Sequence, residues 1–560
     1  MRSGKRLVFA NFGSGRLGDH KGVEAIVRRM AGGRQLDREP IDASWRVSAA
    51  LAAREAMPTR LFEAVAILQT TCGENCRTVL PVSTSPQAYC DAASARCFGR
   101  SAPAAHPRLI LAASVLASSL AFVDGSVVNV ALPAIGRAFS ADAGALQWTV
   151  NAYLLPLSAI LLLGGAAGDR LGRRRLLLWG TVLFAVASLV CALAPHLALL
   201  LAARFLQGVG SAMLMPNSLA ILGQTFTEER KGRAVGIWAA ASAVAGALGP
   251  VLGGWLVDLG SWRAIFLINL PIAAVAVVLA LRYIPEDRAE RREPLDVLGA
   301  ALVTTGLGLL TWVLTLAGAP AGPSGITGLM ALGAIGLLLL FVIVEIRRGD
   351  RALVPMNLFS APTVVGLNLV TLLLYGALGA LLVLMPYVLI EALRYSAAQA
   401  AAALLPLPIV MALVSPLAGS LAERVGPRTP IAVGSIAVGL GMVLTLRIHA
   451  STGYWTGLLP AVIVVARGLS AAVAPLTTAV LGDVQLRYTG AASGLNSAVA
   501  RTGGLLATAM VGSVFAARGV GLLRSFHVTM AIGAVVCWSA ALGAWALVRG
   551  ARPQLRANDP

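Results

Sequence analysis

Long apolar runs that alternate with short charged patches dominate the chain from Arg108 onward. Each run is about 20 residues long, the length that an α-helix needs to cross the hydrocarbon core of a membrane. We count fourteen such runs, and each predicts one spanning helix. The predicted spans are 109–132, 146–166, 176–194, 199–222, 234–257, 264–281, 296–317, 326–345, 363–390, 399–421, 429–446, 456–480, 490–515 and 527–548.

The composition supports a membrane protein. Of the 560 residues, 57% are hydrophobic and 13% are charged, whereas a soluble domain is about 25% charged. This excludes a disordered chain and a small disulfide scaffold, and it argues against a soluble enzyme. The net charge of +19 would suggest nucleic-acid binding in a soluble chain, but its distribution has another explanation.

Basic residues are concentrated in every second loop. If the loop after the second span is cytoplasmic, that side and the C-terminal tail carry 20 basic residues, against 6 in the opposite loops. The positive-inside rule then predicts a multi-pass protein of the bacterial cytoplasmic (inner) membrane with both termini in the cytoplasm. The net charge therefore reflects topology. The lipid bilayer is the predicted partner, and nucleic acid is not.

One loop pattern occurs twice. The sequence GAAGDRLGRRR follows the second span at 165–175, and GSLAERVGPR follows the tenth at 419–428. If each six-helix half carries this loop between its second and third helices, spans seven and eight are an insertion. Two parallel halves predict a substrate site between them near the midplane.

This repeat divides the chain into five parts. We predict a cytoplasmic, partly disordered N-terminal extension over 1–107, a six-helix bundle over 108–283, two inserted spanning helices within 284–361, a second six-helix bundle over 362–548, and a cytoplasmic tail over 549–560. The extension shows no secretory signal. Its cysteines lack a standard zinc spacing, and no metal site is predicted: they are Cys72, Cys76, Cys90 and Cys97.

Four charged residues lie well inside predicted spans, away from the span ends: Asp124, Arg204, Arg467 and Arg501. A charge at this depth costs about 2.5–3.5 kcal/mol on insertion scales, so we expect these side chains to face the bundle interior or a water-filled cavity. An acid that is costly when ionised can accept a proton on one side and release it on the other. The alternative is that these charges only hold helices together through hydrogen bonds.

Four motifs, in order along the chain, resemble one family. They are FVDGSVVNVALP at 122–133, the loop at 165–175, RFLQGVGSA at 204–212 and GPVLGG at 249–254, which is followed by WRAIFLINLP at 262–271. Together they resemble the fourteen-helix drug:proton antiporter branch (EmrB/QacA type) of the major facilitator superfamily. The resemblance covers roughly 105–550. It implies an all-α fold of two six-helix bundles plus two inserted helices.

The resemblance also implies roles for residues. It implies that Arg204 takes part in proton coupling. From the residues themselves, we predict that Asp124 carries the proton beside it, with Gln207 and Asn129 completing their network. The first copy of the loop would act as a gate through Gly165, Asp169, Arg170, Gly172, Arg173 and Arg174. We expect Asp169 to lie just before the third helix, where a carboxylate favours the helix N-terminus. The alternative for this loop is a plain topology anchor.

The fifth span carries small residues at helical spacing. The resemblance implies that its antiporter motif seals one side of the exporter through Gly249, Pro250, Gly253 and Gly254. Ala245 stands where the motif often has its first glycine, and Gly246 could compensate. Generic small-residue packing is the alternative.

Polar and aromatic residues in the spans are candidates for the cavity lining: Asn129, Trp148, Asn151, Gln207, Tyr375, Asn496 and Arg501. Aromatic residues at helix ends are alternatively interface anchors. Buried acids other than Asp124 are scarce, which favours neutral or anionic compounds over dications.

The predicted function is therefore proton-coupled multidrug efflux of small amphiphilic drugs or toxic compounds by alternating access. Export of a single metabolite or siderophore is an alternative, and a transporter-like membrane sensor or scaffold is another. No phosphate-binding loop or catalytic constellation occurs, so we predict no enzyme and no cofactor, with the proton gradient as energy source. In a host with two membranes, the resemblance also implies a periplasmic adaptor and an outer-membrane channel as partners.

Overall fold

The computed structural model describes residues 106–226, 228–286, 296–317, 325–349, 352–354, 356–360, 362–449, 451–482, 489–517 and 519–548. The predicted tail, almost all of the predicted extension and the four cysteines between 72 and 97 lie outside these residues. Fourteen helical segments in the described ranges are long and apolar enough to cross a membrane. The prediction of an all-helical polytopic chain is confirmed.

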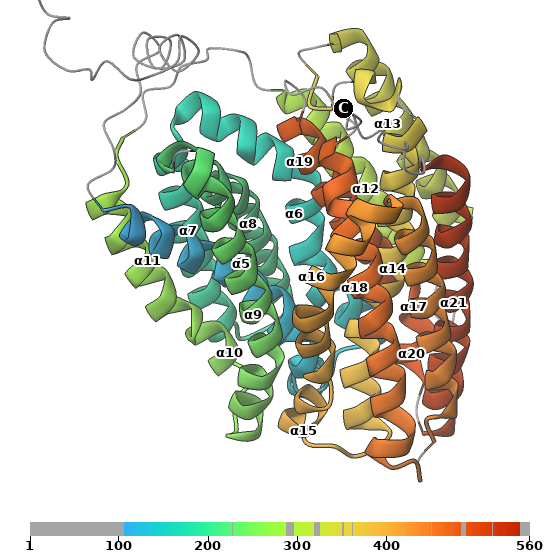
Figure 1. Cartoon of the computed structure of the whole chain (residues 1–560). Helices are drawn as coiled ribbons and strands as arrows, with labels where there is room; N and C mark the ends of the chain where they lie inside the picture. Colours follow the sequence, from blue (N-terminus) through green and yellow to red (C-terminus); the bar gives the residue numbers. More distant parts are fainter. Residues whose placement is uncertain are drawn as a thin grey trace, which may run out of the picture. The chain divides into compact units, whose positions relative to one another are not determined.

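Seven helices form a first group, coloured blue to green in Figure 1. They are α5 (Pro107–Phe139), α6 (Ala143–Leu171), α7 (Arg173–Leu193), α8 (Leu197–Thr225), α9 (Glu228–Asp258), α10 (Ala264–Leu267) and α11 (Asn269–Tyr283). We call this group the first half. Its last predicted span is divided between α10 and α11.

The inserted pair consists of α12 (Val297–Ala317) and α13 (Gly325–Arg348). The second half, coloured yellow-orange to red in Figure 1, follows the short η4 (Met356–Ser360). It comprises α14 (Pro362–Glu391), α15 (Ala397–Ala402), α16 (Pro406–Val425), α17 (Arg428–Leu444), η5 (Thr445–Arg447), η6 (Tyr454–Leu458), α18 (Leu459–Gly482), α19 (Thr489–Met510), α20 (Gly512–Ala516) and α21 (Val520–Leu547).

Two further predicted spans contain a break. The tenth is divided into α15 and α16. Proline is favoured in the first turn of a helix because its missing N–H has no intrahelical acceptor there, and α16 begins at Pro406. The thirteenth is interrupted at Val511, between α19 and α20. The long run at 363–390, by contrast, forms one continuous helix, α14.

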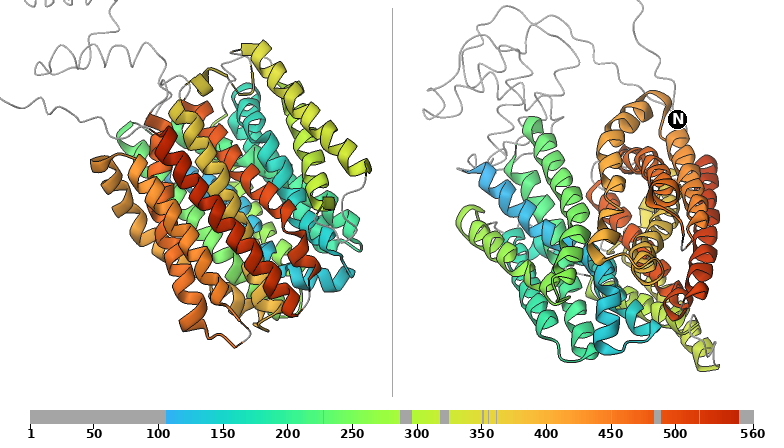
Figure 2. Two further views of the ribbon diagram at one scale, coloured as in Figure 1. Left: turned by 90° about the vertical axis from the view of Figure 1, so that its right-hand side faces the viewer. Right: turned by 90° about the horizontal axis from the view of Figure 1, so that it is seen from below.

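Viewed along the bundle, the two halves lie side by side (Figure 2, right). Large apolar side chains project outward from both, for example Trp255, which is 56% exposed, and Leu542, which is 72% exposed. An apolar surface of this extent is expected where lipid replaces water. The bundle therefore has the surface of a membrane protein.

The halves meet firmly at one end. We call the end where α6 turns into α7 the basic end and the other the opposite end. At the opposite end Arg137 pairs with Glu391 at 2.7 Å. Gln147 Nε2 donates to the Thr508 and Ala509 carbonyl oxygens at 3.1 and 3.0 Å. These contacts hold α5 to α14 and α6 to α19.

Helix α9 shows a difference between its two ends. Near the opposite end, Asp258 accepts hydrogen bonds from the backbone N–H groups of Ala397 and Ala398, at 3.1 and 2.9 Å, and thereby caps α15 of the second half. Near the basic end, Gly232 and Gly236 are exposed, and no atom lies within 4 Å of where a Cβ would stand. On this side, the contact between the halves that the described residues show lies at the opposite end of α9, whereas the surroundings of Gly232 and Gly236 are open.

The inserted pair covers the other seam. Helix α12 contacts both α6 and α19, and its Trp312 packs against Trp148 of α6 at 5.4 Å between ring centroids. Helix α13 is largely exposed, with Ile326 at 73%, and it lies at the edge of the bundle in Figure 2, left. The insertion therefore packs on the bundle from outside.

Candidate functional site

A buried ion pair lies in the interior of the first half. Asp124 of α5 is 0% exposed and Arg204 of α8 is 1% exposed. Arg204 Nη1 donates to Asp124 Oδ2, and Arg204 Nε donates to the Thr149 carbonyl oxygen of α6 at 3.2 Å. The guanidinium also stacks over the Tyr153 ring, with Cζ 4.5 Å from its centroid. One pair thus joins three helices.

Amide and hydroxyl groups complete this network. Gln207 Nε2 donates to Asp124 Oδ1 at 3.2 Å and to Ser188 Oγ at 2.8 Å. Asn269 Nδ2, from the start of α11, donates to the same Asp124 oxygen at 3.3 Å. The side chains of Gln207, Ser188 and Asn269 are each 0% exposed. Both carboxylate oxygens of Asp124 therefore have partners, and the network reaches α7 and α11.

The two buried charges of this network compensate each other. Losing one partner of a buried ion pair leaves the other charge uncompensated, which costs about 3–5 kcal/mol. A proton on Asp124 would remove the charge that holds Arg204 and weaken the ties among five helices. The arrangement can therefore convert protonation into helix movement.

The network differs from the sequence-based prediction in one member. Gln207 joins it as expected, but Asn129 does not: Asn129 Oδ1 is buried without a partner in the described residues. Asn129 is five positions after Asp124, which turns it about 140° around the helix. Asn269 occupies the expected place. It lies in the motif at 262–271, but the sequence showed no reason to assign it to Asp124.

The first copy of the repeated loop has its contacts within the first half. Arg173 pairs with Asp169 at 2.7 Å, and Arg174 donates to the Leu281 carbonyl oxygen at 2.6 Å. Asp169 precedes the third helix, as expected, but it lies in the last turn of α6, which continues to Leu171, and it accepts from the Arg173 side chain and does not cap α7. The N-cap of α7 is Gly172, whose φ of +100° favours glycine.

The remaining loop residues differ in exposure. Arg170 is exposed and Gly165 is half-buried. An alanine at Gly165 would meet the Pro216 ring of α8 at ordinary contact distance, 3.4 Å. In the second copy, Arg428 stacks over Trp545, with Cζ 4.0 Å from the ring centroid.

The antiporter motif on α9 makes close helix contacts. A Cβ on Gly249 would collide with Val123 and Ser126 of α5, and one on Gly253 would collide with Val127. Gly254 lies against Ala397 of α15, in the other half. Pro250 lies inside the helix. Gly246 has no atom within 4 Å of an added Cβ, so it does not supply the close approach that Ala245 lacks.

The other candidates for the cavity lining have different surroundings. Trp148 packs on the inserted pair. Asn151 is 0% exposed, and neither its Nδ2 nor its Oδ1 has a partner in the described residues. Asn496 of α19 donates to Thr371 Oγ1 of α14 at 2.7 Å, and Tyr375 is half-buried on α14.

Arg501 is the candidate that reaches across the halves. It lies on α19, and its Nη2 is 3.5 Å from Met215 Sδ of α8. Its Cζ is 5.8 Å from the Phe122 ring centroid of α5. Arg467, in contrast, is exposed on α18 and has no ion pair among the described residues.

The expectation that Asp124 is nearly alone as a buried acid is wrong. Asp296 is 5% exposed and Glu345 is 0% exposed. Arg348 pairs with Asp296, and Glu345 Oε2 accepts from the Val354 N–H at 2.6 Å. This acidic pair belongs to the inserted helices at the basic end. Among the described residues, no group of three or more His, Cys, Asp or Glu side chains could hold a metal ion.

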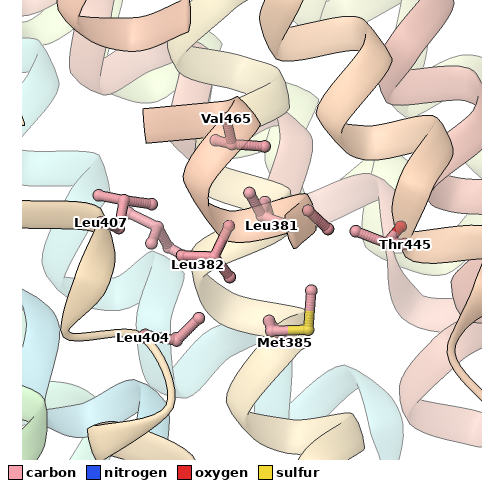
Figure 3. A pocket seen from close by; sticks show the side chains of 9 residues that line it. Leu381, Leu382, Met385, Leu404, Leu407, Thr445 and Val465 are labelled. Atoms are coloured by element: carbon pink, nitrogen blue, oxygen red, sulfur yellow. The ribbon is translucent and has the colours of Figure 1, made fainter. Parts of the chain in front are cut away.

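A small cavity lies inside the second half (Figure 3). Leu381 and Met385 of α14, Leu407 of α16 and Val465 of α18 are among its lining residues, and Thr445 is the only polar one. The Thr445 hydroxyl donates to the Met442 carbonyl oxygen at 2.6 Å. The cavity is therefore apolar apart from one hydroxyl whose proton is already donated, and it offers a ligand no free hydrogen-bond donor.

Known proteins place this bundle in a family. The model of the Major Facilitator Superfamily matches residues 114–508. The chain belongs to the Major Facilitator Superfamily. Its relatives include the multidrug resistance protein Stp of Mycobacterium tuberculosis, 34% identical over 73% of this chain and 76% of the relative. Another is the cephamycin export protein CmcT of Amycolatopsis lactamdurans, 33% identical over 74% and 86%.

A solved structure has the same fold. The D-xylose–proton symporter matches with a TM-score of 0.59 over 79% of this chain and 98% of that chain, at 16% identity. This likeness concerns the fold. The chain is thus a multi-pass transporter of the Major Facilitator Superfamily, related to drug and antibiotic exporters, and not an enzyme. With its fourteen spans and these relatives, the predicted fourteen-helix branch is confirmed.

Proposed function

We propose that this transporter exports small amphiphilic drugs or toxic compounds across the cytoplasmic membrane and takes up protons in exchange. The carrying observation is the Asp124–Arg204 network, a carboxylate with one compensating charge in a bundle interior. An intramembrane acid in such a place is typical of proton relays in transporters. The relatives whose names denote multidrug resistance and antibiotic export support the substrate class.

A path of contacts connects this network to the closed end. Asp124 lies on α5 among Val123, Ser126 and Val127, the residues against which Gly249 and Gly253 of α9 pack. Helix α9 then ends at Asp258, which caps α15 of the other half. When Asp124 is protonated and releases Arg204, α5 can shift, and α9 carries this shift to the seam. Proton binding thereby changes which end is closed.

The orientation follows from the loop charges. We propose that the basic end and both termini are cytoplasmic. The described contacts of α9 then correspond to a state closed toward the outside. In this state, a compound enters from the cytoplasm, and protonation from the outside follows after the closed end opens. We keep the periplasmic adaptor and the outer-membrane channel as predictions from the family resemblance.

The test is compound sensitivity in a pump-deficient bacterium. Wild type, Asp124→Asn, Arg204→Ala and the surface control Arg447→Gln would be expressed at matched membrane levels against a broad toxicant panel. We expect wild type and the control to protect against several unrelated compounds and both network variants to protect against none. Protection by the network variants equal to wild type would refute the coupling role.

A second candidate is export of one metabolite. The relative that is named for cephamycin export favours it. A dedicated exporter would protect against one chemical class in the same panel, whereas a multidrug exporter would protect across classes. The breadth of the resistance profile therefore separates the two functions.

A further inference from the structure

We infer that Arg501 binds the carboxylate of the exported compound, while Phe122 and Trp238 hold its aromatic or apolar body. The inference rests on the proposed export function and specifies its substrate class. It starts from a cation, at the contact between the two halves, that has no anion to compensate it in the described chain.

The polar contacts of Arg501 are poor for a guanidinium. This group has five N–H donors, yet the acceptor it meets across the interface is a thioether sulfur, Met215 Sδ at 3.5 Å, which accepts hydrogen bonds weakly. No carboxylate among the described residues forms an ion pair with it. Most of its hydrogen-bonding capacity is therefore free for a ligand.

The carboxylate nearest in the facing helix already has hydrogen-bond partners. Asp124, the acid of the facing helix α5, accepts hydrogen bonds from Arg204, Gln207 and Asn269. Asp296 and Glu345 are engaged at the inserted pair, by Arg348 and by backbone N–H groups. Charge compensation for Arg501 would therefore come from outside the described chain, and a bound anion supplies it.

The Phe122 ring stands beside the guanidinium, and the Trp238 ring stands against Phe122. Phe122 and Trp238 meet edge to face, with centroids 6.4 Å apart. Trp238 Nε1 donates to Ser118 Oγ at 2.8 Å, which fixes the indole. Both rings are half-buried, and so is Tyr375 on α14. A guanidinium pairs bidentately with a carboxylate, and aromatic faces accept a flat apolar body. The geometry suits an amphiphilic monoanion and disfavours dications.

The test measures binding to the full-length protein in detergent by isothermal titration calorimetry. The probes are 2-naphthoate and 2-naphthamide, which share a ring system and differ in charge at neutral pH. We expect wild type to prefer the naphthoate. Arg501→Gln should weaken naphthoate binding about 10- to 100-fold, the value of hydrogen bonds to a charged group, and leave naphthamide binding unchanged. Arg447→Gln, which removes an exposed arginine at the end of the bundle, should change neither.

Three results would overturn the inference: no binding of naphthoate to wild type, equal binding of naphthoate by Arg501→Gln, or an equal loss of both probes in a folded variant. Arg501→Lys decides the case in which the glutamine variant does not fold. It keeps the charge without the planar fork, and we expect naphthoate binding between those of wild type and the glutamine variant. Naphthoate binding to Arg501→Lys at wild-type strength would overturn the bidentate contact.

Failure of this inference and failure of the export proposal give different results. If cells expressing wild type resist several compounds while naphthoate binding does not change in Arg501→Gln, the export function is supported and the anion site is refuted. If naphthoate binding depends on the Arg501 charge but no strain is protected, the anion site is supported and drug export is refuted.

Discussion

Arg204 and Arg501 are both arginines inside membrane-spanning helices, but their surroundings are opposite. Arg204 is buried within one half, where Asp124 compensates its charge and Tyr153 covers it. Arg501 is half-buried between the halves and meets a sulfur and a ring. A charge inside a rigid bundle needs a permanent partner, because an uncompensated buried ion is costly. A charge at a contact that opens can take its partner from the substrate.

Removing each arginine should affect stability very differently. Arg204→Met leaves Asp124 buried without its cation and should cost about 3–5 kcal/mol of unfolding free energy. Arg501→Met removes an uncompensated charge and should be neutral or stabilising. Thermal unfolding of the purified proteins, followed by circular dichroism, compares them. Equal destabilisation would end the distinction between the two arginines.

A double substitution sharpens the same comparison. Asp124→Asn combined with Arg204→Gln removes both charges and keeps polar groups of similar size, so it should recover most of the stability that Arg204→Met loses. Transport driven by a proton gradient should stay absent, because the network then holds no carboxylate. Recovered gradient-driven transport would show that the proton site lies elsewhere.

The contact between α5 and α9 can be strained without touching a charge. Gly253→Ala and Gly249→Ala should each cost about 1–3 kcal/mol, because the new methyl group collides with α5 beside Asp124. Gly246→Ala is the matched control on the same helix, since its site is open. Thermal unfolding and toxicant resistance should fall together in the first two variants only. An equal loss of stability and resistance in Gly246→Ala would show that any added methyl group on α9 has this effect, and that the contact with α5 is not its cause.

The cap of α15 should set how firmly the opposite end closes. Asp258→Ala removes the acceptor for the Ala397 and Ala398 N–H groups, and a lost cap costs about 1 kcal/mol. Spin labels at the exposed positions Ala138 and Ala402, in a background without native cysteines, should then report longer distances between the halves. An unchanged distance distribution would show that Asp258 does not hold the seam.

The exposed loop pair is predicted to matter least for stability. Asp169→Asn breaks the Asp169–Arg173 ion pair, whose members are 50% and 23% exposed, so the unfolding free energy should change by about 0.5 kcal/mol or less. Because stability is nearly unchanged, resistance measured on the same variant reports the gating role of the loop alone. A strong loss of resistance at unchanged stability supports a gating role, whereas unchanged resistance supports a topology anchor.

Apolar run length was sufficient to predict the spans, and charge inside a run was sufficient to select Asp124 and Arg204. Both signals are local and follow from the cost of polar groups in lipid. Which side chains hydrogen-bond to Asp124 depends, in contrast, on how each helix is rotated and on residues far away along the chain. Asn269 therefore replaced Asn129 in the network without a warning in the sequence.

Helix boundaries and exposure were the other features that the sequence could not resolve. Asp169 falls within the last turn of α6 because the helix continues to Leu171, and a shift of two or three residues decides whether an acid caps a helix or pairs along it. Arg467 and Arg501 look alike in sequence, but among the contacts of the described residues only those of Arg501 reach the other half. Which face of a helix meets the partner bundle is set by tertiary packing.

The most direct test of the account is transport in proteoliposomes with an imposed pH gradient. Wild type, Asp124→Asn and Arg501→Gln would be compared for gradient-driven accumulation of a neutral substrate found in the resistance panel, and for its exchange without a gradient. We predict that Asp124→Asn loses accumulation but keeps exchange, while Arg501→Gln keeps both. Accumulation by Asp124→Asn at the wild-type rate would contradict the claim that the Asp124–Arg204 network carries the coupling proton.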